Sequence, residues 1–163
     1  MHVNASAPRS RTAKTARGIE TYFLAVAKTE DAQRVADMEN ASIRFEAVSH
    51  VEKEDPLSFI INDMAENEHL RESSELAALV QKRLTTAQPA FDRGVKQGPF
   101  RVLVTSYMPA VLVEVGYATN VDDATLLLDA AHQRKLAQGI ANAAMDYFDE
   151  YDRRVGIGSR NPH

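Results

Sequence analysis

One carboxylate in this sequence lies in a setting that favours proton transfer. Glu114 is part of the run VLVEVGY, near the end of a predicted buried strand. Burial disfavours the charged form of a carboxyl group and raises its pKa towards the range that is useful at neutral pH. Sites in open α/β sheets gather at the carboxyl ends of the strands, which favours a functional role for Glu114. The alternative is a strand-end glutamate that faces solvent or pairs with an arginine.

The histidines give weaker evidence for a metal site. Hydrolytic zinc needs about three protein ligands from His, Glu or Asp and one open position for water. His2 and Asn4 share one side of an extended strand, although a histidine beside an initial methionine can also be an ordinary surface residue. Three further histidines do not have the spacing of metal ligands and are predicted to lie at the surface: His50, His69 and His132.

Composition limits the classes of protein to consider. The chain has 163 residues, of which 44% are hydrophobic and 26% charged, as expected for one globular domain with a sizeable core. A formal net charge of -4 offers no basic surface for phosphates, so a nucleic-acid partner is not expected. No apolar run approaches the roughly 20 residues that span a bilayer, and the first residues lack the pattern of a signal peptide. Cysteine is absent, so the chemistry must come from His, carboxylates and hydroxyls.

Periodicity and turn residues predict an α/β architecture, with a mostly parallel twisted sheet flanked by helices. Short runs rich in β-branched residues predict three strands, over 19–26, 100–105 and 110–117. Apolar residues at helical spacing predict helices over 30–45, 55–64, 68–86, 122–128 and 131–151. Proline and glycine between 88 and 100 predict a loop.

Two features of the predicted helices are specific enough to test. Thr29 precedes Glu30 and Asp31, as an N-cap residue precedes an acidic first turn. The acidic residues of the helix over 68–86 are predicted to form a solvated face: Glu68, Glu72 and Glu75.

Several segments resemble one known family. The segment MPAVLVEVGYATN, residues 108–120, is similar to the block that carries the catalytic glutamate in bacterial zinc-dependent N-acetylmuramoyl-L-alanine amidases. ARGIETYFL, residues 16–24, resembles the block that follows the last zinc histidine, and HVNA, residues 2–5, looks like the end of that histidine's strand motif. ESSELAALVQ and RGVKQGPFRVL, which begin at Glu72 and Arg93, match further blocks in the same order. The resemblance extends over nearly the whole chain.

The resemblance implies a peptidoglycan hydrolase with a Zn²⁺ cofactor. His2 would be a zinc ligand, and Glu114 would be the general base that takes a proton from the zinc-bound water. The bond cleaved would be the amide between N-acetylmuramic acid and the L-alanine of the stem peptide. Asn4 would orient a ligand or the substrate. Such a protein would act in the periplasm or outside the cell.

One departure from the family pattern is informative. The family places another zinc histidine and a zinc glutamate upstream of the strand that ends in HVNA, where this chain begins. We therefore expect residues 1–155 to be the C-terminal portion of the catalytic domain, without the first strands of its sheet, and to be inactive alone. Residues 156–163 are expected to form a disordered tail. The alternative function is a non-catalytic remnant of the amidase fold that binds peptidoglycan or a divisome partner.

The segment of about 30–86 is predicted to be a helical insert. In some cell-division amidases, a helix inserted near this place blocks the zinc site until an activator protein displaces it. Residues 55–72 would do this here if Glu66 or Glu68 offered its carboxylate to the metal. The alternative is a plain amphipathic helix that packs on the sheet.

Overall fold

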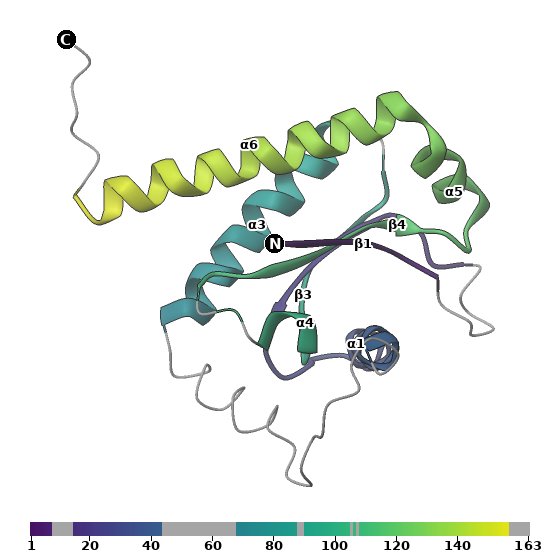
Figure 1. The fold of residues 1–163 in the computed structure, drawn as a ribbon, viewed down its shortest axis with the longest axis horizontal. Coiled ribbons are helices and arrows are strands. Elements are labelled where there is room, and N and C mark those ends of the chain that lie inside the picture. Colours follow the sequence, from purple (N-terminus) through teal and green to yellow (C-terminus); the bar gives the residue numbers. More distant parts are fainter. Residues whose placement is uncertain (8–14, 44–67, 88–89, 105, 107, 157–163) are drawn as a thin grey trace, which may run out of the picture.

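A four-stranded sheet lies between two layers of helices in the computed structural model, which describes residues 1–7, 15–43, 68–87, 90–104, 106 and 108–156 (Figure 1). The strand order is β1-β4-β2-β3. β1 pairs with β4 and β2 with β3 in parallel, whereas the central pair, β2 and β4, is antiparallel. The strands are β1 (His2–Ser6), β2 (Ile19–Leu24), β3 (Asp92–Gly98) and β4 (Val111–Tyr117). The predicted α/β architecture with a mostly parallel sheet is confirmed.

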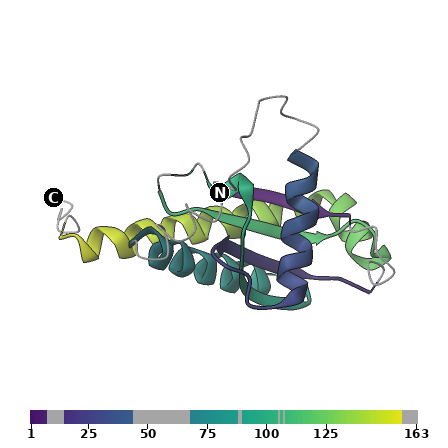
Figure 2. The ribbon, with the colours of Figure 1, turned by 90° about the horizontal axis from the view of Figure 1, so that it is seen from below.

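The helices are divided between the two faces of the sheet, as the views in Figures 1 and 2 show. Helices α3 and α6 cover one face, and α1 and α4 cover the other. Helix α5 follows β4 and leads into α6. Their bounds are α1 (Glu30–Ile43), α3 (Glu68–Ala87), α4 (Arg101–Val104), α5 (Val121–Leu128) and α6 (Ala130–Arg154). None of the helices described is both long and apolar enough to cross a membrane.

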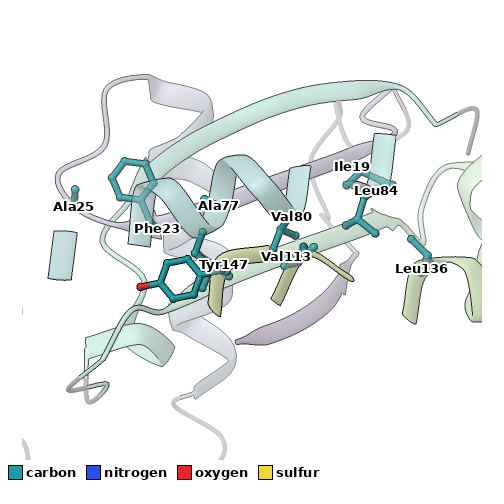
Figure 3. Packing of buried hydrophobic residues seen from close by; sticks show 12 residues of the cluster. Ile19, Phe23, Ala25, Ala77, Val80, Leu84, Val113, Leu136 and Tyr147 are labelled. Carbon is teal, nitrogen blue, oxygen red and sulfur yellow. The ribbon is translucent and has the colours of Figure 1, made fainter. Parts of the chain in front are cut away.

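Strand β2 is buried along its whole length because both of its faces are covered. Successive side chains of a strand point to opposite faces of the sheet. Ile19 and Phe23 therefore pack with α3 and α6 in one apolar cluster, part of which Figure 3 shows. Tyr22 and Leu24 pack in a second cluster with α1 and α4. These two clusters are the core on either side of the sheet.

Helix α3 is a main element of the core, although it falls within the predicted insert. Its residues Val80 and Leu84 are fully buried, one turn apart, and pack towards β2 and α6 (Figure 3). A Cβ atom added at Gly139 of α6 would lie 3.0 Å from Leu84 Cδ2, so glycine allows the two helices to approach closely here. The prediction of a helix over 68–86 is confirmed.

Helix α1 begins where the sequence predicts. The Thr29 hydroxyl accepts a hydrogen bond from the Ala32 N–H at 3.1 Å, which makes Thr29 the N-cap. The buried residues Ala32, Val35 and Ala36 form the stripe that packs against the sheet. At the other end, Asn40 accepts from the Arg101 N–H and donates to the Pro99 carbonyl, each at 2.8 Å. Helix α1 is therefore held at both ends.

The prediction of a strand over 100–105 is wrong. Residues 101–104 form the short helix α4 instead. Phe100 and Leu103 are both buried in the core beneath α1, and a spacing of three places two side chains together on a helical turn. A short apolar run without polar interruptions has no visible period, so the sequence alone does not distinguish these two structures.

The prediction of a loop over 88–100 is also wrong, because it contains β3. This strand lacks the apolar alternation that signals a strand, since it lies at the edge of the sheet. The side chains of Arg93 and Lys96 are only 18% and 20% exposed, and they occupy positions where an aliphatic residue would be expected. Ion pairs, described below, allow charged residues to be buried there.

Two predictions of surface exposure are wrong. His132 is buried in the first turn of α6, and burial lowers the pKa of its imidazole. Glu72 is buried on α3, so it does not belong to a solvated acidic face, whereas Glu75 is partly exposed and pairs with Arg154 at 2.6 Å.

Other predictions lie outside the described residues. They concern the helix over 55–64, His50, Glu66 and the tail beyond Gly156.

Leu84→Ala should lower the free energy of unfolding by about 2–5 kcal/mol, because it leaves a cavity between α3, α6 and β2. The matched control is Leu128→Ala in α5, where the leucine is 85% exposed. The control should change stability by less than about 0.5 kcal/mol. Urea unfolding followed by circular dichroism measures both, and equal losses would contradict the assignment of Leu84 to the core.

Candidate active site

Glu114 lies in the middle of β4 and is fully buried. It faces the α1 side of the sheet. Leu112, two residues before it, packs in the cluster under α1 and α4, whereas the adjacent Val113 packs on the opposite face. Its carboxylate accepts two hydrogen bonds from β1, one from the Asn4 side-chain amide and one from the Ser6 backbone N–H, each at 3.1 Å. The predicted burial of Glu114 is confirmed, and the structure brings Asn4 directly to it. The predicted place near the end of the strand is wrong, because β4 continues to Tyr117.

An irregularity in the sheet makes the second of these hydrogen bonds available. Asn4 is paired with Glu114, but Ser6 is paired with Tyr117, so β4 has one residue more than β1 over this step. Such a bulge interrupts the ladder and redirects the groups beside it. The Ser6 carbonyl still accepts from the Ala118 N–H at 2.8 Å, whereas the Ser6 N–H turns to the Glu114 carboxylate.

Burial raises the pKa of Glu114 to about 7, and the nearby Glu39 carboxylate adds to the rise. The hydrogen bonds from Ser6 and Asn4 act in the opposite direction, because they stabilise the charged form. Both of these donors are neutral groups. A carboxyl group with a pKa near neutrality can accept a proton and release it again under the same conditions.

A second fully buried glutamate lies directly opposite. Glu20 of β2 is the antiparallel partner of Glu114 and faces the same side of the sheet. One of its oxygens accepts hydrogen bonds from the hydroxyls of Tyr22, at 2.8 Å, and Tyr117. The other lies 2.8 Å from Arg93 Nε and 2.6 Å from Lys96 Nζ.

The two glutamates therefore have different protonation behaviour. Burial by itself would raise the pKa of Glu20, but Lys96, Tyr117 and Arg93 together lower it below its usual value. Asp31 of α1 also pairs with both cations, at 2.9 and 3.0 Å, which balances the charge of the cluster. Glu20 stays ionised as a structural group, whereas Glu114 can carry a proton.

The end of β4 that follows Glu114 is fixed by Asp123. One oxygen of its buried carboxylate accepts from the backbone N–H groups of Gly18 and Tyr117, both at 2.8 Å. Asn120, the N-cap of α5, accepts from the N–H groups of Asp122 and Asp123. The first turn of α5 thus joins the beginning of β2 to the end of β4.

His2 lies at the exposed start of β1, opposite Leu112. Strand alternation places it on the same face as Asn4, one step further from Glu114. Among the described residues, no three His, Asp or Glu side chains form a group that could hold a metal ion. These residues by themselves do not fit the three-ligand zinc site that the resemblance implies.

Sequence reasoning missed Glu39, Arg93 and Lys96. Glu39 in α1 accepts a hydrogen bond from the Ser6 hydroxyl at 3.3 Å. The sequence does contain a signal that Glu39 faces the sheet. It follows the buried Ala32 by seven residues and the buried Ala36 by three, which is the spacing of one helix face. Arg93 and Lys96 had no such signal, since only the sheet pairing places them beside Glu20.

Fold and site define a layered α/β domain with a buried, protonatable glutamate one strand in from the edge of its sheet. A family model described as N-acetylmuramoyl-L-alanine amidase, Amidase_3, matches residues 1–146, and the chain belongs to this family. The family resemblance predicted from the sequence is confirmed.

The chain is also similar to individual relatives and to solved structures. The amidase AmiA of Escherichia coli is 26% identical over 123 residues, which are 76% of this chain and 43% of AmiA. The protein YqiI of Bacillus subtilis is 40% identical over 78 residues, which are 48% of this chain and 38% of YqiI. A crystal structure of an N-acetylmuramoyl-L-alanine amidase from Clostridium difficile has a TM-score of 0.57 and 24% identity, covering 90% of this chain and 55% of that one. The chain spans about half the length of these relatives or less.

Stability should depend on pH through Glu114. Its folded pKa of about 7 lies above the usual value of 4.5, so the folded chain binds this proton more tightly than the unfolded chain. The contribution to stability is fully present below about pH 4.5 and is lost as pH rises through 7, a change of about 3 kcal/mol. Urea unfolding from pH 4.5 to 8 should show this loss in the wild type and not in Glu114→Gln; parallel curves would contradict it.

Glu20→Gln should lower the free energy of unfolding by about 3–5 kcal/mol, because it leaves Arg93 and Lys96 beside a neutral group in a buried site. The control is Asp146→Asn, which breaks an ion pair with Arg83 at the surface. Exposed pairs contribute about 0–1 kcal/mol. Thermal unfolding of both variants at pH 7 measures the difference, and similar losses would show that the Glu20 cluster is not a buried network.

Proposed function

We propose that this chain is part of a peptidoglycan hydrolase that cleaves the amide between N-acetylmuramic acid and the L-alanine of the stem peptide. The observation that carries the proposal is Glu114, a buried glutamate whose pKa is raised to about 7, in a chain of the amidase family. Glu114 would act as the general base towards water and return the proton to the leaving amine. A carboxylate with an ordinary pKa would be a poorer proton donor at neutral pH.

Asn4 and Ser6 would hold the base in place. Their two donors bind different oxygens of Glu114, which fixes the plane of the carboxyl group. The remaining lone pairs on these oxygens would accept the proton of the attacking water. Asn4 is partly exposed, so its side chain could also contact the substrate, as the resemblance implies.

Zinc dependence is part of the proposal. His2 is exposed at the start of β1 and would be one ligand. Since the described residues contain no three-donor group, the remaining ligands would come from outside them. Zinc would supply Lewis-acid chemistry when bound. A chain without those ligands would be inactive, which is why we propose that catalysis needs more than the part described here.

Location and regulation are also proposals. Peptidoglycan lies outside the cytoplasm, so the complete protein would act in the periplasm or outside the cell. An activator protein that acts on the segment of about 30–86 is also part of the proposal. The CwlD amidase of Clostridioides difficile, with 17% identity and a TM-score of 0.54, was solved in complex with the GerS lipoprotein.

The alternative is a domain that binds peptidoglycan or a divisome partner without cleaving it. It is favoured by the lack of a three-donor metal group among the described residues. It leaves Glu114 unexplained, because burial of a protonatable carboxyl group costs stability and binding alone does not require it.

The decisive measurement combines zinc content with the release of stem peptides from purified sacculi. The 163-residue chain is compared with a version extended by the codons that precede Met1 in the reading frame. We expect the extended protein to bind zinc and release stem peptides. Glu114→Gln should lower release at least about 100-fold and leave zinc bound, because a general base contributes about 10²–10⁴-fold. Glu150→Gln, an exposed position on α6, is the control and should retain full activity.

Two outcomes would overturn the proposal. Full release by Glu114→Gln would remove Glu114 from the mechanism. Sacculus binding without zinc or release in either version would support the binding domain instead.

A further inference from the structure

A single residue connects two carboxylates at the site. Ser6 donates its backbone N–H to Glu114 at 3.1 Å and its hydroxyl to Glu39 at 3.3 Å. Ser6 itself is only 1% exposed, and its carbonyl is used by the Ala118 N–H. Both of its donors are therefore directed to glutamates from different elements, one in the sheet and one in α1.

Glu39 is held at this place by the whole of α1. Its helix is capped by Thr29 and anchored to α4 through Asn40, the residue next to Glu39. Asp31, in the first turn, pairs with Arg93 and Lys96 of β3. With both ends fixed and the stripe between them buried, α1 cannot rotate Glu39 away from Ser6 without breaking these contacts.

We propose that Glu39 is a positioning residue for Glu114. Glu39 acts through its hydrogen bond with Ser6 and through its own charge, so α1 sets both the orientation and the proton affinity of the base. The inference deepens the proposed function and rests on it for the role of Glu114. It adds to that function a residue from another element, α1, whose carboxylate is coupled to the base.

The charged groups around Glu114 make this coupling specific. Glu39 faces it from α1, and Glu20 faces it from β2. The charge of Glu20 is countered by Arg93 and Lys96, which lie in β3 on the far side of Glu20. From β1, Asn4 and Ser6 donate neutral hydrogen bonds to Glu114, and the titratable His2 lies on the same face one step further away. Of the two nearby carboxylates, Glu39 is the larger cause of the raised Glu114 pKa, after burial itself.

The test is a titration of the Glu114 carboxyl carbon by ¹³C NMR in the wild type and in Glu39→Gln, with the signal assigned from Glu114→Gln. Removing the charge of Glu39 should lower the Glu114 pKa by roughly 0.5–1 unit. The matched control is Asp37→Asn, which removes an exposed carboxylate from the same helix and should leave the pKa unchanged. Thermal unfolding at pH 5 checks that both variants remain folded.

A double-mutant cycle tests whether Ser6 transmits the effect of Glu39 to Glu114. In Ser6→Ala, which keeps the backbone donor to Glu114 but loses the hydroxyl, Glu39→Gln should lower the Glu114 pKa less than in the wild-type background. If Glu39→Gln is poorly folded, Glu39→Asp replaces it; this variant keeps the charge but is one methylene shorter, so it tests the contact with the Ser6 hydroxyl. A Glu114 titration that is the same in the wild type and in both folded Glu39 variants would overturn the inference.

Failure of this inference can be distinguished from failure of the proposed function. The titration needs no turnover, so it reports on Glu39 even if peptidoglycan is not cleaved. In an active extended protein, Glu39→Gln should move the acidic limb of the kcat/KM profile to lower pH, by the shift measured by NMR. An unchanged limb, together with loss of activity in Glu114→Gln, would overturn the role of Glu39 alone.

Discussion

The burial of two glutamates opposite each other, on one face of the sheet, is the constraint on which the rest of this structure depends. Glu20 and Glu114 are paired across β2 and β4 and are both fully buried. Two adjacent unpaired carboxylates in a low-dielectric interior would repel each other strongly. The fold resolves this by giving cations and phenol hydroxyls to Glu20 and neutral donors to Glu114, so that one stays charged and the other can hold a proton.

This division of roles explains the difference between the two faces of the sheet. The face under α3 and α6 is a conventional apolar core, with Val80, Leu84 and Val113 at its centre. The face under α1 combines an apolar cluster with the charged network and Glu114. The α1 side therefore accommodates a carboxyl group whose charged form is unfavourable beside a second apolar cluster. Strained or costly groups of this kind are retained where function requires them.

In the proposed mechanism, the chain would contribute the proton-transfer part of an amidase site, which is supported on three sides. β1 supplies donors, β2 supplies the opposing charge, and α1 supplies Glu39. The chain covers 43% of AmiA and 55% of the Clostridium difficile amidase, and the described residues do not assemble three metal donors. Glu114 and the groups that support it form one unit within the described residues, and the metal ligands of the proposed mechanism would be added to it.

The sequence alone determined the family, the layered architecture and the burial of Glu114, because continuous blocks such as VLVEVGY encode them locally. It also determined the start of α1, since a cap and an acidic first turn are local signals. Tertiary structure decided the rest. The strand β3 has no apolar period, α4 is too short to show one, and the contacts of Glu20 and Glu114 join residues about 70 to 110 positions apart. Such contacts depend on strand order and register, which no local pattern in the sequence specifies.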